Sequence, residues 1–403
     1  MAARPPAARQ RAGDPPTGGP LAGVTVLDLS TVGPAARATR LLADYGASVV
    51  KVGAVPGRGP APVTPPFFAY SAGRGLRRVL LDLRHPDGRH GFLALAASAD
   101  VVVESFRPGV VDRLGIGYED VRARNPGIVY CSTSGYGQDG ARSGWAGHDL
   151  DYLAVSGYLA TSEPAAGGGP PLPGATVADA AAGGLHAALA ITTALVARRP
   201  GGDGAYLDVS VADGALWLMS LVVDEHLATG AVPGPGHDVL TGRYACYGTY
   251  RAADDRFVAV AAIEAKFFAN LCRALGCEEW IDRQYDDAAQ DDIRAALAAA
   301  FARCDRDVWV AKLSAEDTCV APVATVAEAC SDPLGAARTA VVEACRPDGQ
   351  RFLQLAPLLA GMPAPAVPVA VPDPAATDTD ELLRAAGVSP ERIAAWRREG
   401  VVA

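Results

Sequence analysis

Short apolar runs alternate with helical stretches over the first half of the chain. Six of the runs have the length and composition of buried strands: 24–29, 47–52, 78–83, 100–104, 127–132 and 205–210. Helical stretches lie between several of them, including 35–45, which Gly46 closes, and 90–97. Near-continuous apolar strands that alternate with helices are typical of a parallel sheet covered on both faces. The pattern therefore predicts an α/β fold with a doubly wound sheet.

The pattern is mostly helical in the middle of the chain. The helical stretches are 177–199, 211–227 and 266–313. The first contains small residues at 180–184, which suit close packing of helices. A Pro-Gly segment at 233–236 reads as a linker, and a hairpin pattern follows at 247–262. Because the block at 226–330 has its own hairpin and helices, we expect it to form a second, smaller domain.

The two ends of the chain differ in character. Residues 1–20 hold Arg, Pro and Gly without the apolar segment of a signal peptide, so we expect a disordered leader. The Pro-rich run 363–374 is expected to be extended. Residues 377–399 predict a charged helix pair that Gly387 interrupts.

Composition narrows the class of protein. The 403 residues are 50% apolar and 20% charged, which is enough for a sizeable core without a membrane. The net charge of −9 argues against nucleic acid as the main partner. No run of eighteen apolar residues stands out, so we expect neither a transmembrane helix nor a membrane partner. Eight scattered cysteines without metal-ligand spacing fit a reducing cytoplasm and predict no metal site.

The densest group of chemically active side chains lies at 145–152, after a Gly-rich turn at 134–140. An imidazole, two acids and a phenol fall within five residues there, and the apolar residues that follow indicate the start of a helix. Backbone N–H groups at a helix start favour negative charge, so they could stabilise an oxyanion beside a base. Asp179 and Glu264 are two further candidate carboxylates. Each side chain alone could equally be structural: His148 as a capping residue, Asp179 as an N-cap and Glu264 as a solvated acid.

Several motifs occur in a fixed order and together carry a resemblance. They include Phe-Arg-Pro-Gly at 106–109 and Ser-Gly-Tyr-Gly-Gln at 134–138, and the full set lies at 21–24, 41–47, 104–109, 113–118, 134–138, 208–211 and 387–390. The chain resembles the family III CoA-transferases (the CaiB/BaiF proteins), and within them the α-methylacyl-CoA racemases. This resemblance implies a large Rossmann-like domain built from 21–225 and 331–403, with a smaller α+β domain at 226–330. It also implies an interlocked homodimer, in which the two chains thread through one another.

The resemblance divides the candidate chemistry between two activities. Transferases of the family use an aspartate nucleophile at the position of Asp179. The racemases use that aspartate as a base, and add Gly-His-Asp and Ile-Glu motifs that match Gly147-His148-Asp149 and Ile263-Glu264. We therefore expect a racemase or epimerase with His148 and Asp179 as the two acid–base groups and Glu264 orienting the imidazole. The alternatives are a CoA-transferase with Asp179 as nucleophile, or a repurposed member acting on a natural-product intermediate that is not a CoA ester.

The ligand-binding positions match the family only in part. Arg74 and Arg107 match positions that face the CoA phosphates, and Arg suits phosphate because its fork binds two oxygens. Gly53 and Ala54 stand where the family has an acid and an arginine, and Leu76 replaces a basic residue. The residues we assign to ligand binding are Arg74, Leu80, Leu81, Arg107, Gly147, Asp149 and Tyr152. No cofactor is expected apart from CoA as part of the substrate, and a carrier-protein thioester is the alternative handle.

Overall fold

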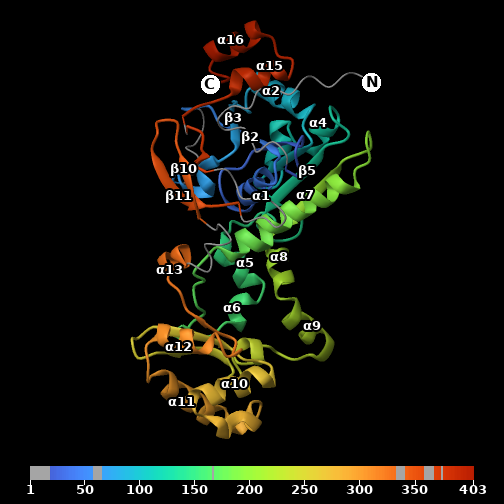
Figure 1. The fold of residues 1–403 in the computed structure, drawn as a ribbon. Helices are drawn as coiled ribbons and strands as arrows, with labels where there is room; N and C mark the ends of the chain where they lie inside the picture. Colours follow the sequence, from blue (N-terminus) through green and yellow to red (C-terminus); the bar gives the residue numbers. More distant parts are fainter. Residues whose placement is uncertain (1–18, 58–65, 166–167, 333–340, 358–366, 374) are drawn as a thin grey trace. The chain divides into compact units, whose positions relative to one another are not determined.

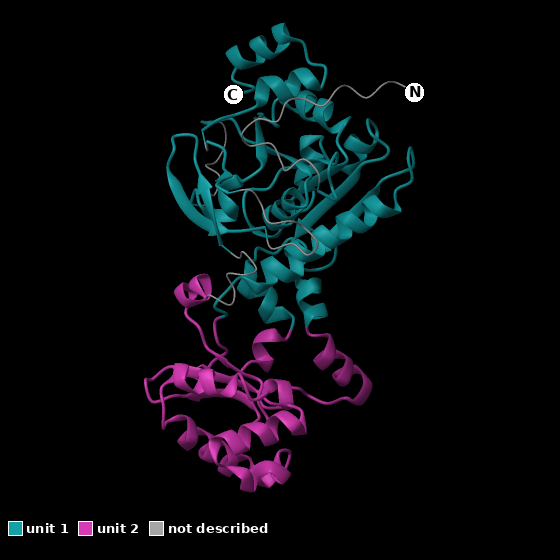
Figure 2. Ribbon diagram, viewed as in Figure 1, with its two compact units in different colours: residues 1–156, 173–218, 336–403 teal, residues 157–172, 219–335 magenta. Residues whose placement is uncertain are grey.

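The structure is a computed structural model that describes residues 19–57, 66–165, 168–332, 341–357, 367–373 and 375–403. The chain forms two compact units, coloured separately in Figure 2. Unit 1 consists of 1–156, 173–218 and 336–403, and unit 2 consists of 157–172 and 219–335. The small domain expected at 226–330 lies within unit 2, but so does 157–172, which the sequence had assigned to the large domain. The leader expected at 1–20 lies outside the described residues up to residue 18.

A six-stranded parallel sheet forms the centre of unit 1 (Figure 1). Its strands are β1 (Thr25–Asp28), β2 (Ser48–Gly53), β3 (Leu76–Leu80), β4 (Val101–Glu104), β5 (Val129–Ser134) and β6 (Ala205–Ser210). Their order is β3-β2-β1-β4-β5-β6, and all neighbours run parallel. Each strand overlaps one of the six predicted runs, so the parallel sheet is confirmed. The strand order reverses beside β1, and ligands of such sheets bind beyond the carboxyl ends of the strands at this point.

Both faces of the sheet are covered, as the near-continuous apolar strands predicted. Val26 and Val49 point to one face, where they pack against α1 (Gly33–Asp44) and α7 (His186–Ala197). Leu27 and Val50 point to the other face. The helices over that second face are α2 (Pro86–Ala96), α3 (Val110–Leu114), α4 (Tyr118–Arg122), α15 (Thr379–Ala385) and α16 (Pro390–Arg398). The alternation of neighbouring strand residues between two cores is what fixes the register of this sheet.

The predicted helix 177–199 is a π-helix, η2 (Ala178–Leu185), that continues into α7. Its small residues do allow close packing: a Cβ on Gly183 would lie 2.5 Å from Cβ of Pro34 in α1. The combined helix, Ala178–Ala197, is long and apolar enough by length and composition to cross a membrane. Core helices of soluble proteins meet the same criteria, and η2 here packs on α1 and on α8 (Val211–Leu218).

Unit 2 has a small antiparallel sheet and its own core. The hairpin predicted from the sequence is formed by β7 (Tyr247–Arg251) and β8 (Phe257–Ala261), and β9 (Val320–Pro322) pairs with β8. Phe268, Phe301 and Trp309 are buried beneath the sheet. The helical elements of the unit are α6 (Tyr158–Thr161), α9 (Ser220–Thr229), η3 (Val239–Thr241), α10 (Ala265–Leu275), η4 (Glu278–Arg283), η5 (Asp287–Ala289), α11 (Gln290–Phe301), α12 (Arg306–Leu313) and α13 (Val326–Ser331).

A second, three-stranded sheet in unit 1 was missed by the sequence analysis. It consists of β10 (Val341–Cys345), β11 (Arg351–Leu355) and the short β12 (Val369–Ala370). Of the run expected to be extended, 363–374, the structure describes 367–373, and the short strand β12 falls within that part. The helix pair predicted around Gly387 is confirmed as α15 and α16.

Candidate functional site

The imidazole candidate, His148, is the N-cap residue of the helix α5 (Asp149–Val155). Its backbone N–H donates to Oδ2 of Asp151 at 2.9 Å, which closes the first turn. The hydroxyl of Tyr152 donates to the carbonyl oxygen of Gly147 at 2.6 Å, and a Cβ on Gly147 would lie 2.8 Å from the Tyr152 ring. The main chain around His148 is therefore held from both sides, while its side chain is exposed.

Asp179 lies in the first turn of η2, next to the start of α5. Its backbone N–H donates to Oδ1 of Asp149 at 2.8 Å, across thirty residues of sequence. This bond ties the two helix starts together and so brings Asp179 to the residue that follows His148. A π-helix at this place is consistent with a functional role, since such segments recur at functional sites.

The surroundings of Asp179 raise the pKa of its carboxyl group. Burial is the main cause, and the charge of Asp149 is the next. Arg37 and His148 act in the opposite direction, because positive charge favours the carboxylate. A carboxylate with a raised pKa is a better proton acceptor than an exposed one, which suits a general base.

Glu264, the third catalytic candidate, belongs to unit 2. It is exposed and is the N-cap residue of α10. The residue before it is anchored: the carbonyl oxygen of Ile263 accepts from Nε2 of Gln284 at 2.7 Å and from the hydroxyl of Tyr285. The structure thus brings His148 and Asp179 together in unit 1. The pairing of Glu264 with His148 stays a prediction.

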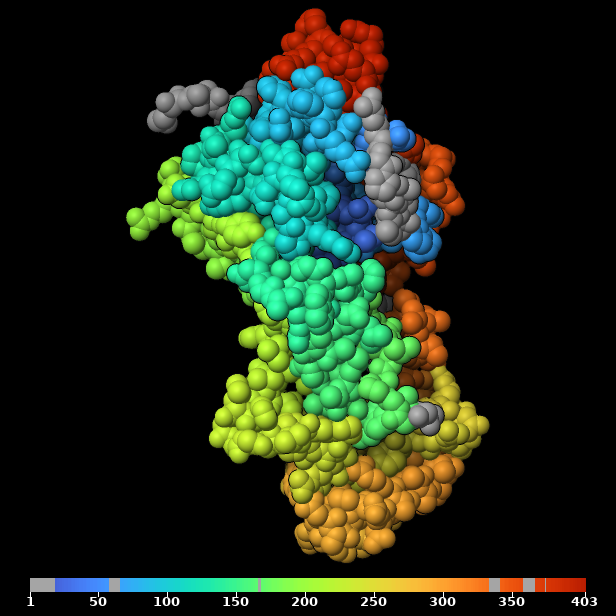
Figure 3. Space-filling view, turned by 180° about the vertical axis from the view of Figure 1, so that it is seen from behind, coloured from blue at the N-terminus to red at the C-terminus, as the bar shows by residue number. Residues whose placement is uncertain are grey.

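A cavity of about 1510 Å³ opens in unit 1 at the carboxyl ends of β1, β2 and β3. Figure 3 shows a recess on this unit, in which the dark blue N-terminal residues lie deeper than the cyan surface beside them. Leu80 and Leu81 line the cavity, as do the departures from the family pattern, Gly53, Ala54 and Leu76. The remaining predicted ligand residues Arg107, Gly147, Asp149 and Tyr152 lie outside the lining that the described residues form.

The side chain of Arg74 is buried next to this cavity, and its guanidinium is already hydrogen-bonded to other residues of the protein. Its guanidinium donates to Oδ1 of Asp44 at 3.0 Å and to the carbonyl oxygen of Leu355 at 2.9 Å, and only 6% of the residue is exposed. Binding a phosphate would compete with these bonds. The phosphate role of Arg74 stays a prediction, as does that of the exposed Arg107.

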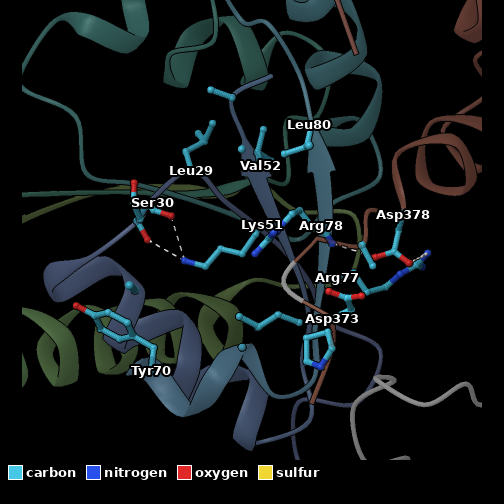
Figure 4. A pocket seen from close by; sticks show the side chains of 18 of the residues that line it. Leu29, Ser30, Lys51, Val52, Tyr70, Arg77, Arg78, Leu80, Asp373 and Asp378 are labelled. Carbon is cyan, nitrogen blue, oxygen red and sulfur yellow. Dashed lines mark hydrogen bonds and ion pairs between the residues drawn. The ribbon is translucent and has the colours of Figure 1, made fainter. Parts of the chain in front are cut away.

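Other cations line the cavity, among them Lys51, which the sequence analysis missed, and Arg77, which it considered as a possible replacement for the lost charges (Figure 4). Nζ of Lys51 lies 2.6 Å from Oδ2 of the buried Asp28 and donates to the carbonyl oxygen of Ser30 at 3.1 Å. Arg77 pairs with Asp378 and with Glu381, at 3.5 Å and 3.0 Å. Lys51 could have been found from the sequence, because it is the one charged residue of the otherwise apolar strand β2. The ion-pair partners of Arg77 could not be predicted, because they lie three hundred residues away in the sequence.

The replacement at Gly53 is coupled to the side chain of Leu80. The two residues are partners across β2 and β3, and a Cβ on Gly53 would lie 2.8 Å from Cδ2 of Leu80. Any larger side chain at position 53 would therefore displace Leu80 from the cavity wall. Among the described residues, no group of three His, Cys, Asp or Glu side chains is arranged to hold a metal ion.

The sequence and fold of this chain are similar to those of known proteins. A sequence profile of CoA-transferase family III matches residues 21–378. The α-methylacyl-CoA racemase of Mus musculus is 35% identical over 387 residues, covering 95% of this chain and 97% of the racemase. The acetyl-CoA:oxalate CoA-transferase of Acetobacter aceti is 32% identical over 343 residues, covering 81% of this chain and 86% of the transferase. A CaiB/BaiF family protein of Brucella suis has a similar solved structure, with a TM-score of 0.72 at 25% identity, covering 95% of this chain and 99% of that one.

Proposed function

The chain belongs to CoA-transferase family III, and we propose that within this superfamily of transferases and racemases it is a racemase or epimerase. The reaction inverts the carbon next to the carbonyl of an acyl thioester. The observation that carries the proposal is the bond from the Asp179 backbone to Asp149, which brings a carboxylate with a raised pKa to the helix start that bears His148.

Proton transfer at such a carbon needs two groups on opposite faces. One group removes the α-proton as the enolate forms, and the other returns a proton to the opposite face, so that no bond to the thiol breaks and no other reactant is consumed. His148 and Asp179 take these two roles, in either direction. The backbone N–H groups near Gly147 and Asp149 are the candidates for stabilising the enolate oxygen, because the first N–H groups of a helix have no acceptor within it.

The substrate's thiol end is assigned to the cavity of unit 1. CoA is the handle we propose, since the mouse racemase that covers 95% of this chain is named for a CoA ester. No further cofactor takes part, because acid–base chemistry alone balances the reaction. The proposal gives Glu264 the role that the family resemblance implies, which is to orient the imidazole of His148.

The experiment follows solvent deuterium into each enantiomer of 2-methylbutanoyl-CoA. The wild type should incorporate deuterium at the α-carbon of both enantiomers and convert each into the other. His148→Ala and Asp179→Asn should each lose inversion by about 10²–10⁴-fold. Each variant should retain exchange with only one enantiomer, and the two variants should prefer opposite ones. Glu264→Gln should slow the reaction less than either. Loss of all exchange in Asp179→Asn with a nearly unaffected His148→Ala would contradict the racemase proposal.

A CoA-transferase is the second candidate, and the 32% identity to the acetyl-CoA:oxalate CoA-transferase favours it. In that reaction the Asp179 carboxylate attacks the thioester carbonyl, the thiolate leaves and an acyl anhydride remains on the protein. Ping-pong kinetics with a second carboxylic acid, together with a trapped adduct on Asp179, would establish it. Such a reaction assigns no role to His148 or Glu264.

A further inference from the structure

A left-handed turn forms one wall of the cavity in unit 1. Tyr70, Ser71 and Ala72 have φ values of 49°, 59° and 53°, and Gly73 follows at 68°. Residues other than glycine adopt this conformation singly and at a cost of roughly 1–2 kcal/mol each, so three in succession require support from their surroundings. Strain of this kind gathers at functional sites.

The support comes from the side chain of Tyr70, which lines the cavity (Figure 4). Its hydroxyl oxygen accepts a hydrogen bond from the backbone N–H of Gly33 at 2.8 Å. The guanidinium of Arg37 lies over the phenol ring, 5.8 Å from its centre. Both contacts belong to α1, so the turn holds Tyr70 against the start of that helix. Among the described residues, the O–H of Tyr70 has no acceptor of its own.

The same helix start faces the candidate base. A Cβ on Gly33 would lie 3.9 Å from Oδ2 of Asp179. Arg37 also lowers the pKa of Asp179, and it donates to Oγ1 of Thr176, close to Asp179 in sequence, at 2.5 Å. Tyr70 and Asp179 therefore both lie close to Gly33, one in the cavity wall and the other in the acid–base site.

We propose that Tyr70 binds the acyl thioester where the cavity meets Asp179, with its O–H donating to a carbonyl oxygen of the substrate. Because Gly33 occupies one acceptor position of the phenol oxygen, the O–H proton is directed away from α1. A carbonyl held by this proton places the neighbouring carbon against Asp179. The inference rests on the proposed function, and it assigns a substrate-binding residue in a turn that the sequence pattern did not indicate.

The test uses 2-methylpropanoyl-CoA, whose α-carbon is identical after inversion, so binding and deuterium exchange can both be measured on one compound. Tyr70→Phe keeps the ring beneath Arg37 and removes only the hydroxyl. Its kcat/KM for exchange should fall about tenfold, and its affinity for 2-methylpropanoyl-CoA should fall several-fold, as expected for one lost hydrogen bond. Its affinity for free CoA, which has no acyl carbonyl, should stay at the wild-type value.

The matched control is Ser71→Gly, which relieves the left-handed strain at a residue outside the cavity lining. This variant should have a raised Tm and wild-type exchange and binding. A purely structural role of Tyr70 would instead weaken CoA and its acyl ester alike.

The possible outcomes separate the two proposals. Exchange by the wild type with unchanged kinetics in Tyr70→Phe would overturn the role of Tyr70 and leave the racemase proposal standing. A wild type without exchange would overturn the racemase proposal, and the loss of affinity for the acyl ester alone would still support Tyr70. Equal affinity of wild type and variant, or no binding of the acyl ester by the wild type, would overturn the inference.

Discussion

Asp149 lies between the two candidate bases, because it follows His148 in the chain and its carboxylate holds the backbone of Asp179. Two negative charges this close disfavour ionisation of one another. Asp149 therefore both positions Asp179 and raises its affinity for a proton. Arg37 from α1, and Tyr152 and His148 from the α5 region, are the other titratable or charged groups that interact with Asp179.

Asp149→Asn separates these two effects. The amide oxygen can still accept the bond from Asp179 N–H, but the neighbouring charge is gone, so we expect the pKa of Asp179 to fall. If Asp179 acts as the base, the acid limb of the kcat/KM profile should move to lower pH. Asp149→Ala loses the bond as well and should lower activity at every pH. An acid limb that does not move in the Asn variant would contradict this account.

Glu104, at the end of β4, is 1% exposed, and burial raises its pKa to about 7 from an ordinary 4.5. In the unfolded chain the group ionises near 4.5, so between these values the folded state holds a proton that the unfolded state releases. Below about pH 4.5, Glu104 is protonated in both states, and its contribution to the free energy of unfolding is therefore at its maximum. It is lost as the pH rises towards 7, by about 3 kcal/mol in total.

Glu104→Gln removes this titration and keeps an oxygen to accept from the Phe106 N–H, which lies 2.7 Å from Oε2 in the native chain. The variant should gain stability relative to the wild type as the pH rises from 5 to 8. Thermal melts across this range measure the difference. Glu119→Gln, at an exposed site of α4, is the control and should show no such trend. A difference independent of pH would mean that Glu104 is not the titrating group.

Single residues were predictable where chemistry and local pattern coincide. His148 and Asp179 lie at the starts of helices that the apolar pattern predicts, and the structure places these two helix starts next to each other. Tyr70 could not be found this way, because its position depends on a left-handed turn and on a bond to Gly33, 37 residues earlier. The ion pair of Arg74 with Asp44 could not be predicted either, because a sequence motif does not show which residue pairs with a buried charge.

The secondary-structure elements followed the apolar pattern closely where they are buried on both faces. The six strands of the parallel sheet are the clearest example. The strands β10 and β11 were missed because a polar residue interrupts the apolar run of each, Glu343 in β10 and Gln354 in β11. Leu353 and Leu355 of β11 are also largely exposed. A strand that exposes one face to solvent has a shorter and less continuous apolar pattern than a strand buried on both faces, so it is harder to predict from the sequence.

The contact of η2 with α1 depends on glycine. A Cβ at position 183 would lie 2.5 Å from Cβ of Pro34 and 3.0 Å from Cγ2 of Val211. Gly183→Ala should therefore lower the free energy of unfolding by about 1–3 kcal/mol, the usual cost of overpacking, despite the better helix propensity of alanine. Gly234→Ala is the control, since no atom lies within 4 Å of its Cβ position. Denaturant titration measures both, and equal stability of the two variants would contradict the close packing.

At the scale of the whole molecule, unit 1 carries large apolar side chains on its surface. Leu189 and Val196 of α7 are 65% and 87% exposed, and Trp217 of α8 is 74% exposed. Both helices contact η2. Large apolar side chains that form a contiguous exposed surface are typical of a protein–protein interface, and we expect this one to be covered by a partner. A second copy of this chain is the partner that the interlocked dimer of the resemblance implies.

An interlocked dimer would behave in a characteristic way when the protein is diluted. Threaded chains cannot separate without unfolding, so sedimentation should give a dimer at every concentration down to the nanomolar range. We propose that the dimer buries Trp217, so Trp217→Lys should lower the stability of the dimer, because an unpaired charge is costly in a buried interface. Lys266→Glu, on the exposed surface of α10 in unit 2, is the control for a change of charge. A monomer that grows with dilution would contradict interlocking.

Unit 1 is built from segments that are far apart in the sequence, and the ribosome therefore synthesises them at different times. The backbone of Asp82 at the edge of the sheet donates to the carbonyl oxygen of Val401 at 2.8 Å, and Trp396 is buried in the core beneath that sheet. Asp378 completes the cavity wall through Arg77. All of unit 2 is translated before these residues emerge. Until these residues emerge, the nascent sheet therefore keeps an open edge at β3, and the face that α15 and α16 later complete is only partly covered. Apolar surface exposed in such an interval is prone to aggregation.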